Sequence, residues 1–188
     1  MIAFVIVFLI IAVGHTNNSP KNVVHEQINE PINLNQQKEI FPIKLSSPVF
    51  LYGESIPTKY TCNGEDINPS LLIENISTQV KTLVLAMEDP DAPTGTWNHW
   101  IAFNIAPSGS SLEIPEGDEN IGTSGRNSWE ETGYSGPCPP SGVHHYVFTV
   151  YALNQNLQLN EGASKQQILG AMQGHVINNV QLIGIYEK

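Results

Sequence analysis

The sequence predicts a mainly β domain, a sheet or sandwich with few short helices. Runs rich in apolar, β-branched and aromatic residues are typical of strands, and stretches dense in Gly and Pro separate them. Of the 188 residues, 40% are apolar and only 14% are charged, with 13 Pro and 15 Gly. These proportions suit a loop-rich globular domain better than a coiled coil or a disordered chain.

Four strands are expected, at residues 81–87, 100–105, 145–153 and 176–186. The proline-containing turns at 89–93, 115–118 and 136–142 cannot lie in central strands, because proline lacks the backbone donor that a ladder needs. One helix is predicted after Ser164, whose spacing to Gln167 is that of a capping box. Its apolar face consists of Ile168, Leu169 and Met172, and Gly174 ends it.

The N-terminal residues 1–13 read MIAFVIVFLIIAV, an apolar run too short to span a bilayer comfortably. Its length suits a signal peptide, and residues 12–14 offer a small-x-small cleavage site, although no Lys or Arg precedes the run. We therefore expect residues 1–14 to be a signal peptide and the protein to be exported, either periplasmic or secreted. An uncleaved membrane anchor and a misassigned start codon are the alternatives.

Residues 15–40 are polar and rich in Asn and Gln, and Pro20 and Pro31 break any helix there. This composition is typical of a flexible tether. The compact domain is expected to span residues 41–188.

The net charge is −10, from 18 acidic and 8 basic side chains. An acidic surface repels phosphate backbones and anionic headgroups, which argues against nucleic acid or a charged bilayer as a partner of the surface as a whole. A local site can still bind an anion if enough hydrogen-bond donors converge on it. The two cysteines, Cys62 and Cys138, permit one disulfide in an exported chain or two unpaired thiols, and they make a weak zinc motif.

An acidic turn, Asp89-Pro-Asp91-Ala-Pro, follows directly on the first predicted strand, and its two prolines restrict the backbone. His99 comes at the start of the next strand. A carboxylate close to a histidine favours the imidazolium and fixes the ring tautomer. The alternative is a pair of turn-capping aspartates beside a surface histidine.

A Gly/Pro loop, residues 136–142, leads into His144, His145 and Tyr146 at the head of the strongest strand. Strand alternation puts His144 and Tyr146 on one face and His145 on the other. A zinc site is not favoured, because the histidines have neither close ligand spacing nor a helical i, i+4 arrangement. The sequence also lacks a Gly-x-Ser-x-Gly elbow, a phosphate-binding Gly-rich loop and His-Glu-x-x-His. We therefore expect no catalytic residue, no metal and no cofactor.

These two motifs closely resemble the two signatures of the phosphatidylethanolamine-binding family: Asp89-Pro-Asp-Ala-Pro with His99-Trp100, then Gly136-Pro-Cys-Pro-Pro-Ser-Gly-Val-His144-His-Tyr146. Residues 60–64, 174–175 and 182–186 look like its bacterial Raf kinase inhibitor-like branch. The resemblance spans residues 41–188 and implies an antiparallel β-sandwich with a pocket for a phosphate-like or carboxylate anion. By motif position, the pocket residues are Asp89, His99, His144 and Tyr146, with Gly136 and Pro137 in the wall.

The resemblance implies a role for each group in this pocket. Asp89 orients the imidazoles, while the histidines, the Tyr146 hydroxyl and N–H groups of the Gly136 segment contact the anion. A disulfide between Cys62 and Cys138 would clamp the Gly/Pro loop beside the pocket. Branch members without the terminal helix of eukaryotic relatives are often dimeric, so a homodimer is one candidate assembly.

The expected function is therefore that of a non-catalytic binding or regulatory protein. Its partner would be a small anionic ligand, and it could inhibit an unidentified partner enzyme. Two alternatives stay open: a hydrolase that uses His99 or His144 as general base, and a structural surface protein with a vestigial pocket.

Overall fold

The computed structural model describes residues 42–118 and 120–188. The predicted signal peptide (residues 1–14), the predicted tether (residues 15–40) and the predicted start of the domain at residue 41 all lie outside these residues. Within them, no helix is long and apolar enough to cross a membrane. The elements, in chain order, are β1 (Lys44–Ser46), η2 (Thr58–Tyr60), β2 (Leu71–Glu74), β3 (Thr82–Asp89), β4 (Trp97–Ile105), β5 (Ser111–Ile114), β6 (Thr123–Ser124), β7 (Val143–Leu153), α1 (Lys165–Met172) and β8 (Val176–Glu187).

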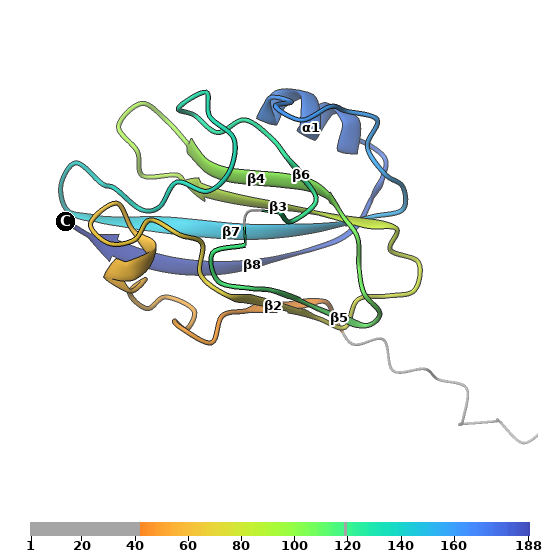
Figure 1. Cartoon of the computed structure of the whole chain (residues 1–188), viewed down its shortest axis with the longest axis horizontal. Helices are drawn as coiled ribbons and strands as arrows, with labels where there is room; N and C mark the ends of the chain where they lie inside the picture. The colour runs from red at the N-terminus through yellow and green to blue at the C-terminus, as the bar shows by residue number, and fades with distance from the viewer. Residues whose placement is uncertain (1–41, 119) are drawn as a thin grey trace, which may run out of the picture. The chain divides into compact units, whose positions relative to one another are not determined.

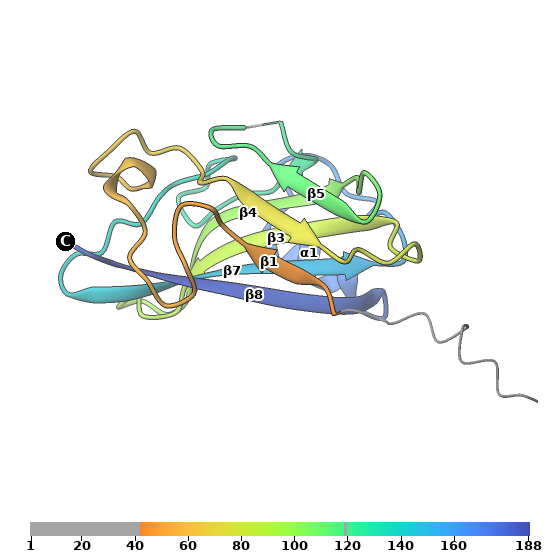
Figure 2. The same ribbon diagram turned by 90° about the horizontal axis from the view of Figure 1, so that it is seen from below.

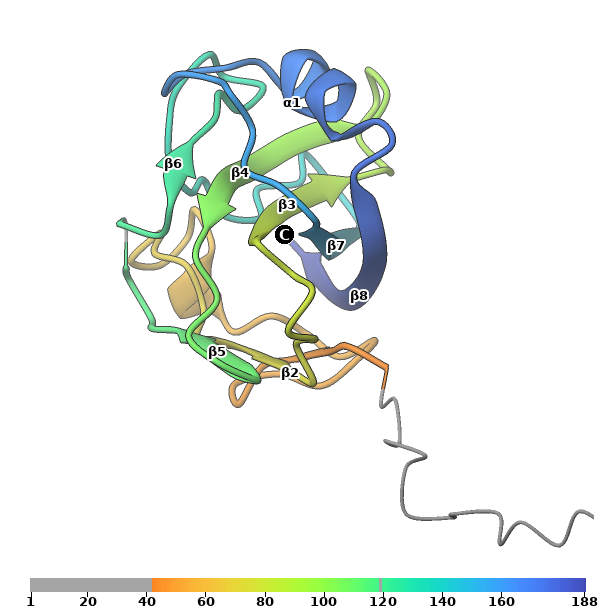
Figure 3. The same cartoon turned by 90° about the vertical axis from the view of Figure 1, so that its right-hand side faces the viewer.

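The domain consists of two antiparallel sheets and one helix, which confirms the predicted fold class. The larger sheet has the order β6-β4-β3-β7-β8 and the smaller has the order β1-β2-β5. The smaller sheet covers one face of the larger sheet, and α1 covers the other (Figures 1 and 3). Figure 2 shows β1, β2 and β5 in front of the larger sheet.

Alternating residues of the central strands feed two apolar clusters. One face of β3 and β7 packs against the smaller sheet through side chains that include Leu85, Met87 and Phe148. The other face of the larger sheet packs against α1 through side chains that include Val84 of β3 and Phe103 of β4. Because both faces of β3 are covered, its first six residues are all buried, which explains why region 81–87 reads as a continuous apolar run. Each large side chain buried in this way stabilises the fold by about 1.5–3 kcal/mol.

Helix α1 begins where the sequence predicts it. The Ser164 hydroxyl accepts the Gln167 backbone N–H, and the Gln167 side chain accepts the Ser164 N–H at 2.9 Å. This capping box contributes about 1 kcal/mol to helix stability. Ile168 and Met172 are buried, but Leu169 is 40% exposed, so its predicted place on the packed face was wrong. A short helix that packs on a sheet buries only the residues on the side that faces the sheet, and Leu169 lies outside that side.

Candidate functional site

The two motifs meet at one end of the larger sheet, beside the C-terminus (Figure 1). Strands β3 and β7 are antiparallel neighbours, paired in register from Thr82 opposite Leu153 to Glu88 opposite Val147. The acidic turn after β3 therefore lies beside the start of β7, where the paired histidines lie. We call Asp89, His99, His144 and Tyr146 the histidine site.

Asp89 and His144 form the inner pair of the histidine site. His144 Nδ1 lies 2.7 Å from Asp89 Oδ2, and the two residues are only 7% and 3% exposed. The other carboxylate oxygen of Asp89 accepts the backbone N–H of Asp91 at 2.8 Å. Because a carboxylate only accepts hydrogen bonds, Nδ1 of His144 carries the proton. Asp89 thus has the geometry of an orienting group for His144.

Asp91 and His145 form an outer pair on the opposite face of β7. Asp91 Oδ2 accepts both the backbone N–H of His145, at 2.8 Å, and its Nδ1–H, at 2.7 Å. These hydrogen bonds hold the pKa of Asp91 below its ordinary value. Both side chains are exposed, so the ion pair itself contributes little to stability. His145 therefore lies outside the histidine site, as strand alternation predicts.

A β-bulge brings His99 into the site. Met87 pairs with Trp100 and Glu88 with Asn98, which leaves His99 as an extra residue on β4. In a regular strand His99 would share the α1-facing side with Ile101. The bulge turns it to the other side, where its ring meets the Tyr146 ring edge-on at 5.2 Å between centroids.

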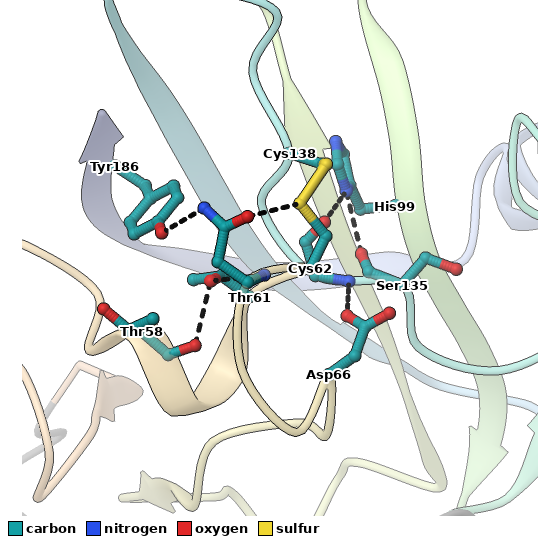
Figure 4. Close-up of a disulfide and its surroundings, with 10 residues drawn as sticks. Thr58, Thr61, Cys62, Asp66, His99, Ser135, Cys138 and Tyr186 are labelled. Atoms are coloured by element: carbon teal, nitrogen blue, oxygen red, sulfur yellow. Dashed lines mark hydrogen bonds between the residues drawn. A yellow bond between two sulfur atoms is a disulfide. The ribbon is translucent and has the colours of Figure 1, made fainter. Parts of the chain in front are cut away.

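His99 is oriented by backbone carbonyls and not by Asp89. Its Nδ1 lies 2.8 Å from the Ser135 carbonyl oxygen and 3.1 Å from that of Gly136, so Nδ1 carries the proton (Figure 4). Burial lowers the pKa of His99 and outweighs these carbonyls and the Asp89 charge, which raise it. The expectation that Asp89 would orient both imidazoles is therefore wrong for His99.

Tyr146 presents a buried hydroxyl to the site. Its side chain is fully buried, and its oxygen has no hydrogen-bond partner among the described residues. Burial raises the pKa of Tyr146, and the Asp89 charge raises it further. The peptide N–H of Cys138 lowers the pKa of Tyr146 in part, although this N–H and the Tyr146 oxygen do not have the geometry of a hydrogen bond. Tyr146 therefore remains a phenol that has a proton to donate.

The Gly/Pro loop is fixed to the segment that follows η2. Cys62 and Cys138 form a disulfide with a Cα–Cα distance of 5.5 Å, and the Cys62 N–H donates to the Pro137 carbonyl at 3.2 Å (Figure 4). A Cβ on Gly136 would lie 2.4 Å from the Tyr60 carbonyl oxygen, so only glycine allows this approach. The Gly136 N–H donates to Asp66 Oδ1 at 2.7 Å. It is therefore not free for an anion, contrary to the expectation for this segment.

Trp129 is a residue of the site that the motifs do not indicate. It is 43% exposed, and its ring meets the His99 ring edge-on at 5.0 Å between centroids. The buried Asn127 holds this turn, because its Oδ1 accepts the N–H groups of Trp129 and Glu131. The sequence feature that could have indicated Trp129 is an aromatic residue in a polar turn, two residues after Asn127.

Two further features of the described residues bear on what the site can bind. They contain no cluster of three His, Cys, Asp or Glu side chains that could hold a metal ion. A polar hollow of about 290 Å³ lies apart from the histidine site and is lined by Asn120, Gly122, Thr123, Ser124 and Glu161. The four residues of the histidine site are themselves all buried, so the site is a cluster of buried polar groups.

Comparisons with known proteins cover the same domain. A family model described as phosphatidylethanolamine-binding protein matches residues 46–187. A UPF0098 protein from Pyrococcus horikoshii is 50% identical over 161 residues, which are 80% of this chain and 79% of that protein. A crystal structure of a phosphatidylethanolamine-binding protein homologue from Chlamydia trachomatis is 43% identical with a TM-score of 0.74, over 78% of this chain and 98% of that one. Escherichia coli YbcL is 25% identical with a TM-score of 0.71, over 79% and 99%.

Proposed function

Because the chain belongs to the phosphatidylethanolamine-binding protein family, we propose that its histidine site binds a small anion, of phosphate or carboxylate type, without converting it. The observation that carries this proposal is the convergence of two imidazoles and one buried hydroxyl at the end of the larger sheet. Among the residues that the structure describes, the hydroxyl of Tyr146 has no hydrogen-bond partner. A buried polar group without a partner costs about 1–3 kcal/mol, and a ligand would recover this cost.

The test is a thermal unfolding titration of the purified protein with phosphate and with phosphoethanolamine. Ligand at about a hundred times its dissociation constant stabilises a protein by about 2.7 kcal/mol, a shift of several degrees for a domain of this size. We expect a saturable shift that is lost in His144→Ala and kept in His145→Ala. The second variant is a matched control, because His145 is adjacent in sequence but faces away from the site. No shift with any small anion would contradict the proposal and leave the vestigial pocket as the better explanation.

A hydrolase is the second candidate, because the Asp89–His144 pair resembles the orienting carboxylate and general base of a catalytic triad. A triad also needs a nucleophile hydrogen-bonded to the second imidazole nitrogen. Within residues 42–118 and 120–188 no hydroxyl or thiol donates to His144 Nε2, which favours the binding role. Turnover of a p-nitrophenyl ester or phosphate that is abolished in Asp89→Asn would support the hydrolase instead.

We further propose that the protein acts after export, as a periplasmic or secreted protein. The apolar run at residues 1–13 and the Cys62–Cys138 disulfide support this, because disulfides persist mainly in oxidising compartments. The same proposal includes the inhibition of a partner enzyme by this protein and its assembly into a homodimer. Fractionation of cells that express the full chain, with mass analysis of its N-terminus, distinguishes a cleaved exported form from an anchored one.

A further inference from the structure

The hydrogen bonds at the site fix which ring nitrogens remain for a ligand. Nδ1 of His144 donates to Asp89, and Nδ1 of His99 donates to loop carbonyls. Neither Nε2 atom makes a hydrogen bond within the described part of the chain. In Figure 4 the free nitrogen of the His99 ring lies at the far end from the carbonyls. When both rings are neutral, each Nε2 offers a lone pair, so the site contains two acceptors and one hydroxyl donor.

The charges around these rings are negative. The carboxylate of Asp89 acts on both His99 and Tyr146, that of Asp66 acts on His99, and that of Asp91 acts on Tyr146. No Lys or Arg is among the groups that shift these two residues. The titratable groups that face the two histidines are Asp89 at the end of β3, Asp91 just after it, Asp66 after η2, Tyr146 on β7, and Tyr186 on β8, opposite His144. An anion without a proton would face the lone pairs of the two Nε2 atoms and the negative carboxylates. Binding therefore requires a proton that the anion already carries or that is taken up from solution.

The two histidines differ in how each can satisfy an anion. His144 has a buried counter-ion 2.7 Å away, and Asp89 can therefore balance a second proton on its ring. His99 has two neutral carbonyls at Nδ1, and burial lowers its pKa. His144 is thus suited to donate from Nε2 to an anionic oxygen, whereas His99 is suited to accept a hydrogen bond at Nε2.

We infer that the histidine site recognises a monoprotonated phosphate monoester, in which His144 and Tyr146 donate to anionic oxygens and His99 accepts the hydrogen of the P–OH group. This inference rests on the proposed function and specifies its ligand. It implies that binding is linked to proton uptake, and that the site rejects a sulfate monoester, which has the same shape and charge but no hydrogen to donate.

The experiment compares methyl phosphate with methyl sulfate by isothermal titration calorimetry at pH 5.5, where both carry one negative charge. We expect methyl phosphate to bind at least about tenfold more tightly, because methyl sulfate leaves the His99 lone pair facing an oxygen. At pH 8, titrations in buffers of different ionisation enthalpy should show uptake of at least one proton per methyl phosphate bound. The affinity should fall by about tenfold per pH unit for each proton that is taken up on binding.

Variants locate the two roles. In His99→Gln the amide can donate as well as accept, so the preference for methyl phosphate over methyl sulfate should shrink while methyl sulfate affinity rises. His145→Gln should keep both the preference and the proton uptake. Equal affinities for the two esters in the unaltered protein, or binding at pH 8 without proton uptake, would overturn the inference and leave the anion proposal standing. No binding of either ester would overturn the inference together with the phosphate form of the anion proposal.

Discussion

At the scale of single residues, Tyr146 carries a hydroxyl that the folded protein does not satisfy. Tyr134 is the matched case, because it is also a tyrosine beside the same loop, but its hydroxyl donates to the Tyr60 carbonyl at 2.7 Å. An unpaired buried hydroxyl lowers stability, whereas a paired one contributes about 0.5–1.5 kcal/mol. Tyr146 is therefore a position where the requirements of binding and of folding conflict.

We predict that Tyr146→Phe leaves the free energy of unfolding unchanged or raises it, while Tyr134→Phe lowers it by about 1 kcal/mol. Ligand affinity should show the opposite order, since only Tyr146 is proposed to donate to the anion. Urea unfolding and calorimetry on both variants measure the two quantities. An equal loss of stability in both variants would show that the Tyr146 hydroxyl has a partner in the folded protein.

The lowered pKa of His99 has a consequence for stability as well. The unfolded chain takes up the His99 proton near the ordinary histidine pKa of about 6.5, whereas the folded protein resists it until a lower pH. Between these two pKa values the unfolded state binds more protons than the folded state. The free energy of unfolding therefore falls as the pH drops below about 6.5. The contribution of His99 to this fall ends once the pH is below the pKa of His99 in the folded protein.

The corresponding prediction is that His99→Gln flattens the loss of stability between pH 7 and pH 5, whatever its effect at pH 7. His145→Gln serves as the control, because His145 is exposed and its bonding is to Asp91. Chemical unfolding at several pH values provides the comparison. Identical pH profiles for the parent and His99→Gln would show that another group is responsible.

At the scale of elements, the sequence predicts the long strands and the helix but not the short strands. The four predicted strands correspond to β3, β4, β7 and β8, because each has enough residues to show a run or an alternation. The strands β1, β2, β5 and β6 contain two to four residues each, too few for any pattern to stand out. Their pairing depends on tertiary contacts that no local signal carries.

The same contrast holds within the site. Alternation along β7 is enough to put His144 and Tyr146 on one face. The face of His99 could not be predicted in this way, because a bulge moves one residue out of the alternation and local sequence does not indicate it. The carbonyls that orient His99 and the carboxylate of Asp66 come from loops whose paths are set by the whole fold.

At the scale of the whole molecule, the disulfide joins two segments that are 76 residues apart. One segment follows η2, between β1 and β2 in the chain, and the other is the loop that precedes β7 (Figure 4). That loop supplies the carbonyls that orient His99 and the backbone near the Tyr146 hydroxyl. A crosslink of this span lowers the entropy of the unfolded chain, and disulfides typically contribute about 2–4 kcal/mol.

The disulfide therefore serves both stability and the site, and these two effects can be separated. In the double variant Cys62→Ser with Cys138→Ser we predict a loss of about 2–4 kcal/mol in the free energy of unfolding. We also predict weaker anion binding at temperatures where the variant is fully folded, because His99 loses part of its restraint. The Asp66→Asn variant tests the second effect with the disulfide intact, since it weakens another tie to the loop, at the Gly136 N–H. If the double variant loses stability but binds as tightly as the parent, the loop geometry does not depend on the crosslink. The hydrogen bonds from the Gly136 N–H to Asp66 and from the backbone N–H of residue 62 to the Pro137 carbonyl are then sufficient to hold it.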